Sequence, residues 1–206
     1  MALPTATTTR TLQHRRSIDI EVYARGDGLW EVDARLIDRG MRASAQRPAG
    51  APIHDMLLRL VVDERFNIVE AGAETLAMPY AGMCNDHGDA YARLVGLNLM
   101  RQFRQEVKER LGGLLGCTHI TELTQTLPTA VVQAFAGTVI DTQGEPESGK
   151  RPFQIDRCHA LRADGEVVRV HYPRWYRQPA VSSGADTAPQ AAAPNLPPQL
   201  PLEAAP

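Results

Sequence analysis

The feature that most constrains the fold is a pair of alternating apolar segments separated by a tight-turn signal. Apolar and polar residues alternate over residues 17–24 and again over residues 30–36, with Asp27–Gly28 between them. A period of two is typical of strands with one buried face, and Asp-Gly is a strong signal for a hairpin turn. The sequence therefore predicts an antiparallel β-hairpin near the N-terminus.

Two further strands are predicted after a loop. Residues 39–51 are small, polar and rich in Pro and Gly, which favours a loop. Residues 56–63 form a short apolar run that indicates a more buried strand, residues 64–67 turn the chain, and residues 68–76 form another strand. The four strands would follow one another in antiparallel succession.

The pattern then becomes helical. Apolar residues recur at every fourth position from Tyr91 to Leu111, which predicts one amphipathic helix of about six turns. Gly112–Gly113 would end this helix. A second helical pattern follows Cys117, and Pro128 must either kink that helix or start a new one.

The last part of the chain divides into a predicted hairpin and a tail. Residues 153–161 and 166–172 flank Asp164–Gly165 and are predicted as a second hairpin, with Cys158 opposite His171. The order of elements predicts an α+β fold, an antiparallel sheet of about four strands packed against two main helices. We expect a single domain over residues 11–177 and a disordered Pro/Ala-rich tail over residues 178–206.

Composition excludes several classes of function. The chain has 22 Lys+Arg and 24 Asp+Glu, so its net charge of −2 argues against a nucleic-acid partner bound through phosphates. No apolar run approaches the ~20 residues of a membrane span. The N-terminal sequence has no apolar signal segment, and three cysteines do not make a disulfide framework. We therefore expect a cytoplasmic protein with no nucleic-acid or membrane partner.

Potential metal ligands stand at the ends of the predicted elements. Thiolate and imidazole are the usual ligands of zinc and iron, and loop or element-end positions allow distant residues to converge. These residues predict a zinc or iron site, although each cysteine could instead be a small hydrophobic residue of the core. The candidate ligands are His54, Asp55, Cys84, Cys117 and His119.

Several segments resemble an uncharacterised bacterial family, the domain of unknown function 2889. The resemblance covers nearly all of residues 10–177 and implies no established activity. The segments that carry it are GAPIHDMLLRLVVDERFNIVEAGAE (50–74), Cys84, LGGLLGCTHITEL (111–123), the HRR of residues 14–16, the DGLWE of residues 27–31 and the YPRWY of residues 172–176.

Residues 50–135 also resemble, more weakly, the U-type iron–sulfur scaffold proteins. That resemblance implies an antiparallel sheet packed against helices, with ligands at one end that hold zinc or a nascent cluster. The first cysteine of that pattern and the glycine after it are missing here, so the ligand set suits a mononuclear ion better than cluster assembly. The ligand positions fall on His54, Asp55, Cys84 and Cys117, with His119 as a nearby nitrogen.

Three functions follow from these observations as expectations. The first is a metal-binding accessory or scaffold-like protein, with Glu122 orienting a ligand and with room for a protein partner. The second is a metal-dependent hydrolase or lyase, in which Glu122 or His119 would be the base. The third is a metal-free module that binds a small molecule or a protein and keeps its cysteines in the core.

Overall fold

The computed structural model describes residues 3–84, 88–145 and 149–179. The chain divides into two compact units, residues 1–153 and residues 154–206. The single domain expected over residues 11–177 stays a prediction, because two compact units can still unfold as one cooperative domain. Most of the expected tail, residues 180–206, lies outside the described residues. Among the described residues, no helix has the length and apolar character needed to cross a bilayer.

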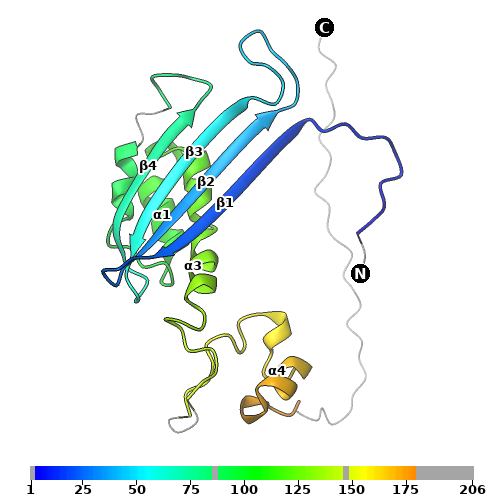
Figure 1. The fold of residues 1–206 in the computed structure, drawn as a ribbon, viewed down its shortest axis with the longest axis vertical. Helices are drawn as coiled ribbons and strands as arrows, with labels where there is room; N and C mark the ends of the chain where they lie inside the picture. The colour runs from blue at the N-terminus through cyan, green and yellow to red at the C-terminus, as the bar shows by residue number, and fades with distance from the viewer. Residues whose placement is uncertain (1–2, 85–87, 146–148, 180–206) are drawn as a thin grey trace, which may run out of the picture. The chain divides into compact units, whose positions relative to one another are not determined.

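The N-terminal unit contains a four-stranded antiparallel sheet whose strands are neighbours in chain order (Figure 1). The four predicted strands are confirmed, and the fold is α+β. Three of the strands run further toward one end of the sheet than their apolar alternation indicates. The strands are β1 (His14–Ala24), β2 (Trp30–Gly40), β3 (Pro52–Val62) and β4 (Ile68–Ala77).

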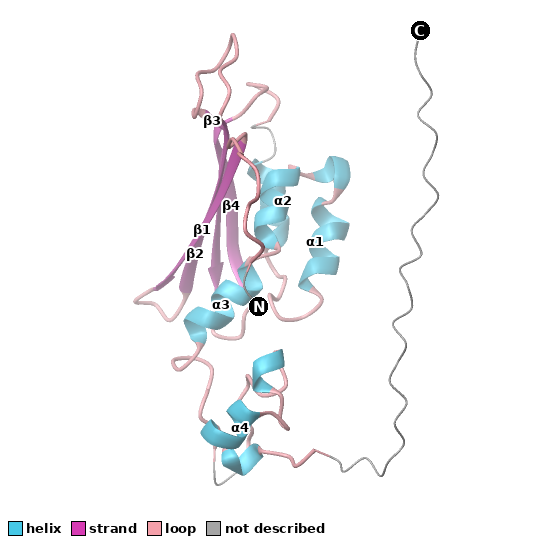
Figure 2. Cartoon of the chain, turned by 90° about the vertical axis from the view of Figure 1, so that its right-hand side faces the viewer, coloured by secondary structure: helices cyan, strands magenta, loops and turns pink. Residues whose placement is uncertain are grey.

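One face of this sheet carries the core. Cross-strand register aligns Ile20 with Ala34 and Ala34 with Leu58, so the apolar positions of neighbouring strands fall on the same face. Figure 2 shows the sheet edge-on, with α1 (Phe103–Leu111) and α2 (Thr118–Thr124) on one side of it. The helices contribute apolar side chains to a shared buried cluster, among them Val107, Leu111, Ile120, Leu123, Val131 and Phe135.

The single long helix predicted from Tyr91 to Leu111 is wrong. The chain instead forms a 3₁₀ helix, η1 (Gly88–Leu94), and then a non-helical segment before α1. In that segment Leu97 O accepts a hydrogen bond from Ile68 N–H at 2.9 Å, and Leu99 N–H donates to Phe66 O at 2.9 Å. The backbone therefore pairs with Ile68 of β4 and with Phe66 just before it, which buries Leu97 and Leu99 and leaves Val95 exposed.

The second helical pattern is confirmed, with a break at its proline. The segment forms α2 and then α3 (Leu127–Phe135), and Pro128 lies in the first turn of α3. Proline is tolerated there because the first backbone N–H groups of a helix have no partner within the helix. Pro128 therefore starts a new helix.

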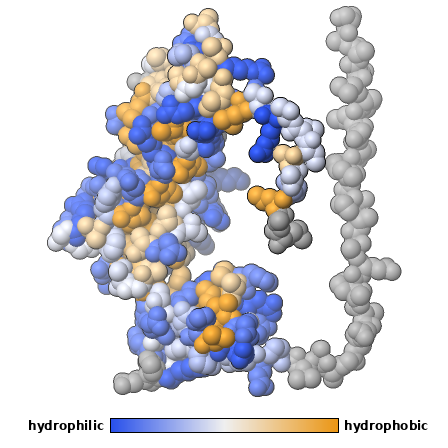
Figure 3. All heavy atoms as spheres, turned by 45° about the vertical axis from the view of Figure 1, so that its right-hand side comes forward, coloured by the Kyte–Doolittle hydropathy of each residue, from blue (hydrophilic) through white to orange (hydrophobic). Residues whose placement is uncertain are grey.

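Residues 153–172 do not form the predicted hairpin. The described part of the C-terminal unit has the elements η3 (His159–Leu161), α4 (Glu166–His171) and η4 (Pro173–Trp175). A hairpin without further strands is marginal in water, and here Val168 is buried in a small cluster while Val167 and Val170 stay exposed. Figure 3 shows apolar side chains at the surface of this unit. Cys158 and His171 are consequently not cross-strand partners.

We predict that Gly96→Ala destabilises the N-terminal unit by about 1–2 kcal/mol, because Gly96 has φ +85° and a Cβ is strained in that region. Gly72→Ala is the matched control, since Gly72 lies in β4 and an added Cβ meets nothing within 4 Å. Denaturant unfolding followed by circular dichroism measures both variants. Equal destabilisation by the two substitutions would contradict the role assigned to Gly96.

Candidate metal centre

A buried carboxylate lies at the end of β2. Asp38 is 2 % exposed. It continues the row of core-facing residues Val32, Ala34 and Leu36, because side chains two positions apart along a strand share a face. The alternation that builds the core therefore also directs this carboxylate toward the helices.

Arg16 neutralises the carboxylate. It lies opposite Asp38 in the β1–β2 register, and its Nε and Nη2 each donate a hydrogen bond of 2.8 Å to one oxygen of Asp38. These bonds, which outweigh the opposing effect of burial, hold the pKa of Asp38 at about 2. Arg16 Nη1 also donates to Glu122 Oε2 on α2, at 2.5 Å. Asp38 is consequently an anion at neutral pH, and the ion pair connects the sheet to α2.

Three histidines surround the same carboxylate. His14 Nε2 lies 3.0 Å from Asp38 Oδ1, and His54 Nδ1 lies 3.1 Å from Asp38 Oδ2. His119 Nε2, on α2, lies 3.8 Å from Asp38 Oδ2. The rings of His54 and His119 are in contact, with centroids 3.8 Å apart and planes inclined by 32°. Two strands and one helix thus bring three imidazoles to one anion.

The environment favours neutral imidazole at His119. Burial lowers the pKa of His119 below its ordinary value of 6.5, and the adjacent His54 lowers it further. Asp38 and Glu122 act in the opposite direction, and Arg16 lowers the pKa again. Neutral imidazole has a free lone pair, which is the form that coordinates a metal ion.

Tyr91 holds the start of α2. Its buried hydroxyl accepts a hydrogen bond from Cys117 N–H at 3.0 Å and lies 2.8 Å from Cys117 O and 2.9 Å from Thr121 Oγ1. Cys117 directly precedes α2, and Thr121 lies near its start, so these contacts fix the beginning of the helix that carries His119. Tyr91 therefore helps to position His119 over the sheet.

The structure brings together some of the predicted ligands. His54 and His119 are in contact, and Cys117 Sγ lies 3.8 Å from His119 Nδ1. Asp55 points to the other face of the sheet, where Arg35 donates hydrogen bonds of 2.8 and 2.7 Å to its two oxygens. His54 and Asp55 are neighbours in β3, so their side chains point to opposite faces.

Cys84 lies apart from this group. It is half-buried in the turn that follows β4, and its N–H donates to Tyr80 O at 3.1 Å. Among the described residues, the one group of three His, Cys, Asp or Glu side chains with ligand atoms within 4.8 Å of one another is Asp38, His54 and His119.

The sequence interpretation does not include Asp38, His14 and Arg16 among the site residues. The apolar alternation ends at Leu36 in β2 and near Ile18 in β1, and the predicted strands end with it. Extending the same alternation by one or two steps leads from Leu36 to Asp38, and from Ile18 to Arg16 and His14. This extended alternation is the sequence signal for the site, because it predicts that all three side chains lie on the face that carries His54.

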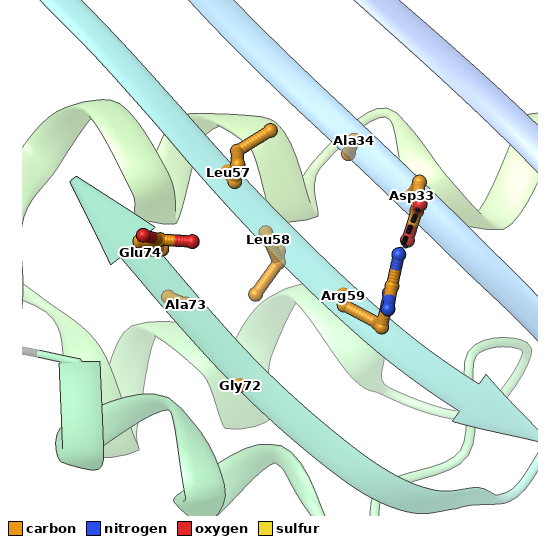
Figure 4. A pocket seen from close by; sticks show the side chains of 8 residues that line it. All are labelled: Asp33, Ala34, Leu57, Leu58, Arg59, Gly72, Ala73 and Glu74. Atoms are coloured by element: carbon orange, nitrogen blue, oxygen red, sulfur yellow. Dashed lines mark hydrogen bonds and ion pairs between the residues drawn. The ribbon is translucent and has the colours of Figure 1, made fainter. Parts of the chain in front are cut away.

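A shallow depression on the other face of the sheet is a less suitable site. Its volume is about 310 Å³, and Figure 4 shows its lining from β2, β3 and β4. Asp33 and Arg59 neutralise each other there through two contacts of 2.6 Å. The lining residues are Asp33, Ala34, Leu57, Leu58, Arg59, Gly72, Ala73 and Glu74. The group of Asp38 and its histidines is therefore the stronger candidate.

The fold and this site define an α+β protein with an antiparallel sheet that carries an Asp/His cluster at one end. The family model described as "Protein of unknown function (DUF2889)" matches residues 14–133, and the chain belongs to that family. The matched region begins at His14 and includes Asp38, His54 and His119. No curated protein and no solved structure matches the chain. The resemblance to U-type iron–sulfur scaffold proteins gains no support from these comparisons.

We predict that acid weakens the fold through Asp38. The pKa of Asp38 is 3.8 in an unfolded chain and about 2 in the folded protein, so the folded state binds fewer protons between these values. The associated stability is complete above about pH 4 and is lost as the pH falls through about 2, with a total of about 2 kcal/mol. Unfolding free energies measured from pH 5 to pH 2 test this.

Asp38→Asn should remove this part of the pH dependence and cost about 2 kcal/mol at pH 7, because Arg16 loses both hydrogen bonds to the carboxylate and keeps only Glu122. Asp19→Asn, on the exposed face of β1, is the control and should change neither quantity appreciably. Unchanged stability of the Asp38→Asn protein at pH 7 would contradict the assigned ion pair.

Proposed function

We propose that this protein binds one divalent transition-metal ion, zinc or ferrous iron, through Asp38, His54 and His119, and that it serves as a metal-binding accessory or scaffold-like protein. The observation that supports this most directly is the convergence of three ligand atoms within 4.8 Å of one another. They come from two strands and a helix, so the backbone fixes their approach.

The spacing of the ligand atoms fits such an ion. Bonds of about 2.0–2.2 Å from a metal ion place neighbouring ligand atoms about 3.0–3.5 Å apart. His54 Nδ1 and His119 Nε2 lie 3.1 and 3.8 Å from Asp38 Oδ2. The first distance falls within this range, and the second exceeds it by a few tenths of an ångström.

The surroundings also suit a metal centre. Arg16, which also donates to Glu122, holds the Asp38 carboxylate in one orientation, which is the role that hydrogen-bond partners of metal ligands have. His14 Nε2 lies 3.0 Å from the other oxygen of Asp38, Oδ1, and adds a third imidazole beside the carboxylate. Two imidazoles and one carboxylate are a ligand set that zinc and ferrous iron both accept.

The ligand types favour a mononuclear ion over cluster assembly. Iron–sulfur clusters need several thiolates, and no cysteine belongs to the group of Asp38, His54 and His119. Cys117 is the nearest thiol that the contacts define, at 3.8 Å from His119 Nδ1. It is the alternative ligand in this proposal, and Cys84 would join only after the turn at residues 81–84 moves.

A second candidate function is metal-assisted hydrolysis or lyase chemistry. Three protein ligands leave at least one coordination position for water or substrate. The side chains of His54 and His119 are 16 % and 26 % exposed, so solvent reaches the ring atoms of both residues. This accessibility is the observation that favours an enzyme.

Metal content is the first test. Protein purified without an affinity tag or added metal should carry about one equivalent of zinc or iron by element-resolved mass spectrometry. His54→Ala and His119→Ala should lose the metal, whereas His171→Ala, an exposed histidine of α4, should retain it. No metal in the wild type, including after anaerobic reconstitution, would rule out both metal functions and favour a metal-free binding module.

Cysteine variants separate the ligand sets. Cys84→Ser and Cys117→Ser should keep the metal if Asp38, His54 and His119 are the ligands. Metal loss in both variants, with retention in Asp38→Asn, would contradict this ligand set in favour of the thiolates.

An open coordination position distinguishes the two metal functions. We expect a cobalt-substituted protein whose visible spectrum changes when azide is added if the ion keeps an exchangeable position, as the enzyme function requires. A spectrum unaffected by azide would indicate a closed coordination shell and favour the accessory role. His171→Ala serves as the control in this titration too.

A further inference from the structure

We propose that two copies of this chain associate through the free edge of β1, with the two β1 strands antiparallel and the two-fold axis at Ile18. The proposal depends on the backbone and charges of one strand and is independent of the metal function. The β1 strand lies at one edge of the sheet order and is eleven residues long (Figure 1). Within the described part of the chain, no strand pairs with its outer edge.

The ladder between β1 and β2 shows which backbone groups face outward. Just beyond the two ends of the pairing, Met41 N–H donates to Gln13 O at 3.0 Å and Arg25 N–H donates to Leu29 O at 2.8 Å. Hydrogen-bonded and non-bonded pairs alternate in an antiparallel ladder, so the odd-numbered residues of β1 make the bonds to β2. The even-numbered residues, from His14 to Ala24, therefore direct their N–H and C=O groups to the free edge.

The side chains at this edge leave apolar surface uncovered. The even-numbered residues Ile18, Ile20 and Val22 share the core face of β1. Ile20 and Val22 are only partly buried against the core, and Ile18 is 36 % exposed. A second β1 strand would place another Ile18 beside the first and extend the apolar row across the junction.

The charges of β1 are complementary to those of the same strand reversed. Arg15 and Glu21 are equally distant from Ile18 and lie on the same face, so antiparallel pairing about Ile18 sets Arg15 opposite Glu21 of the second copy, twice by symmetry. Within one copy Arg15 lies opposite Arg39, and the Arg15 side chain has no hydrogen bond or ion pair with another described residue. The second copy would supply the missing acid.

Charged side chains on edge strands often prevent pairing, but such protection requires charges that repel the incoming strand. Here the basic residues precede Ile18 and the acidic residues follow it. A parallel copy would bring Arg15 beside Arg15, and only the antiparallel arrangement joins opposite signs. The charges of this edge therefore favour antiparallel pairing with a second copy over parallel pairing.

This arrangement would also affect the candidate metal centre. It sets Val22 of the second copy opposite His14, whose side chain is 47 % exposed, and Ile20 of the second copy opposite Arg16. The association would thus cover the solvent side of the polar cluster.

Charge reversal in the full-length chain tests the proposal. Sedimentation equilibrium should show a dimer for the wild type. Arg15→Glu and Glu21→Arg should each raise the dissociation constant about tenfold or more, and the double variant should restore it. A wild-type monomer at all concentrations would overturn the proposal. Single variants with an unchanged dissociation constant, or a double variant whose dissociation constant is not restored, would also overturn it.

Two further variants test the position of the axis. Residue 19 lies opposite Ser17 of the second copy in this register, so Asp19→Arg should leave the dimer intact. Dissociation of the Asp19→Arg protein but not of the Glu21→Arg protein would overturn the register. Ile18→Pro removes an outward-facing N–H while sparing the bonds to β2. It should give a folded monomer, with circular dichroism as the control, and a folded dimeric Ile18→Pro protein would contradict pairing through this edge.

Discussion

The ion pair between Asp38 and Arg16 is the interaction on which the functional end of the sheet depends. A carboxylate that is 2 % exposed would be costly without a partner. Arg16 meets both of its oxygens and also contacts Glu122 on α2. One guanidinium therefore neutralises the buried charge and joins two strands to the helix above them.

At one end of the sheet, polar side chains replace apolar ones on the core face of the strands. Along β1 and β2, the core face is apolar until Ile18 and Leu36 and then becomes charged at Arg16 and Asp38. Buried ion pairs add little net stability compared with apolar residues of the same size. The stability of the fold therefore depends mainly on the apolar core between the sheet and the helices. The polar end is rigid because strands and a helix hold it, which suits a binding site.

The four strands were predictable because their signals are local: alternation and turn residues act within a few positions. The predicted helix from Tyr91 to Leu111 failed because apolar spacing records which side chains are buried and says nothing of where the backbone hydrogen bonds go. Leu97 and Leu99 pair with the start of β4 instead. The hairpin predicted around Asp164–Gly165 failed for a related reason, since valines that suit a strand also form the helix α4.

The sequence by itself determined the four strands, an interruption of the helical pattern at Pro128, and the ligand-type residues His54 and His119. It did not determine which of those residues meet. Tertiary structure decided that Asp38 is their common partner, because only the register between strands sets residues 16, 38 and 54 side by side. It also separated Asp55 from His54, since consecutive strand residues face opposite ways. Distances between residues remote in the chain depend on packing, which no local pattern specifies.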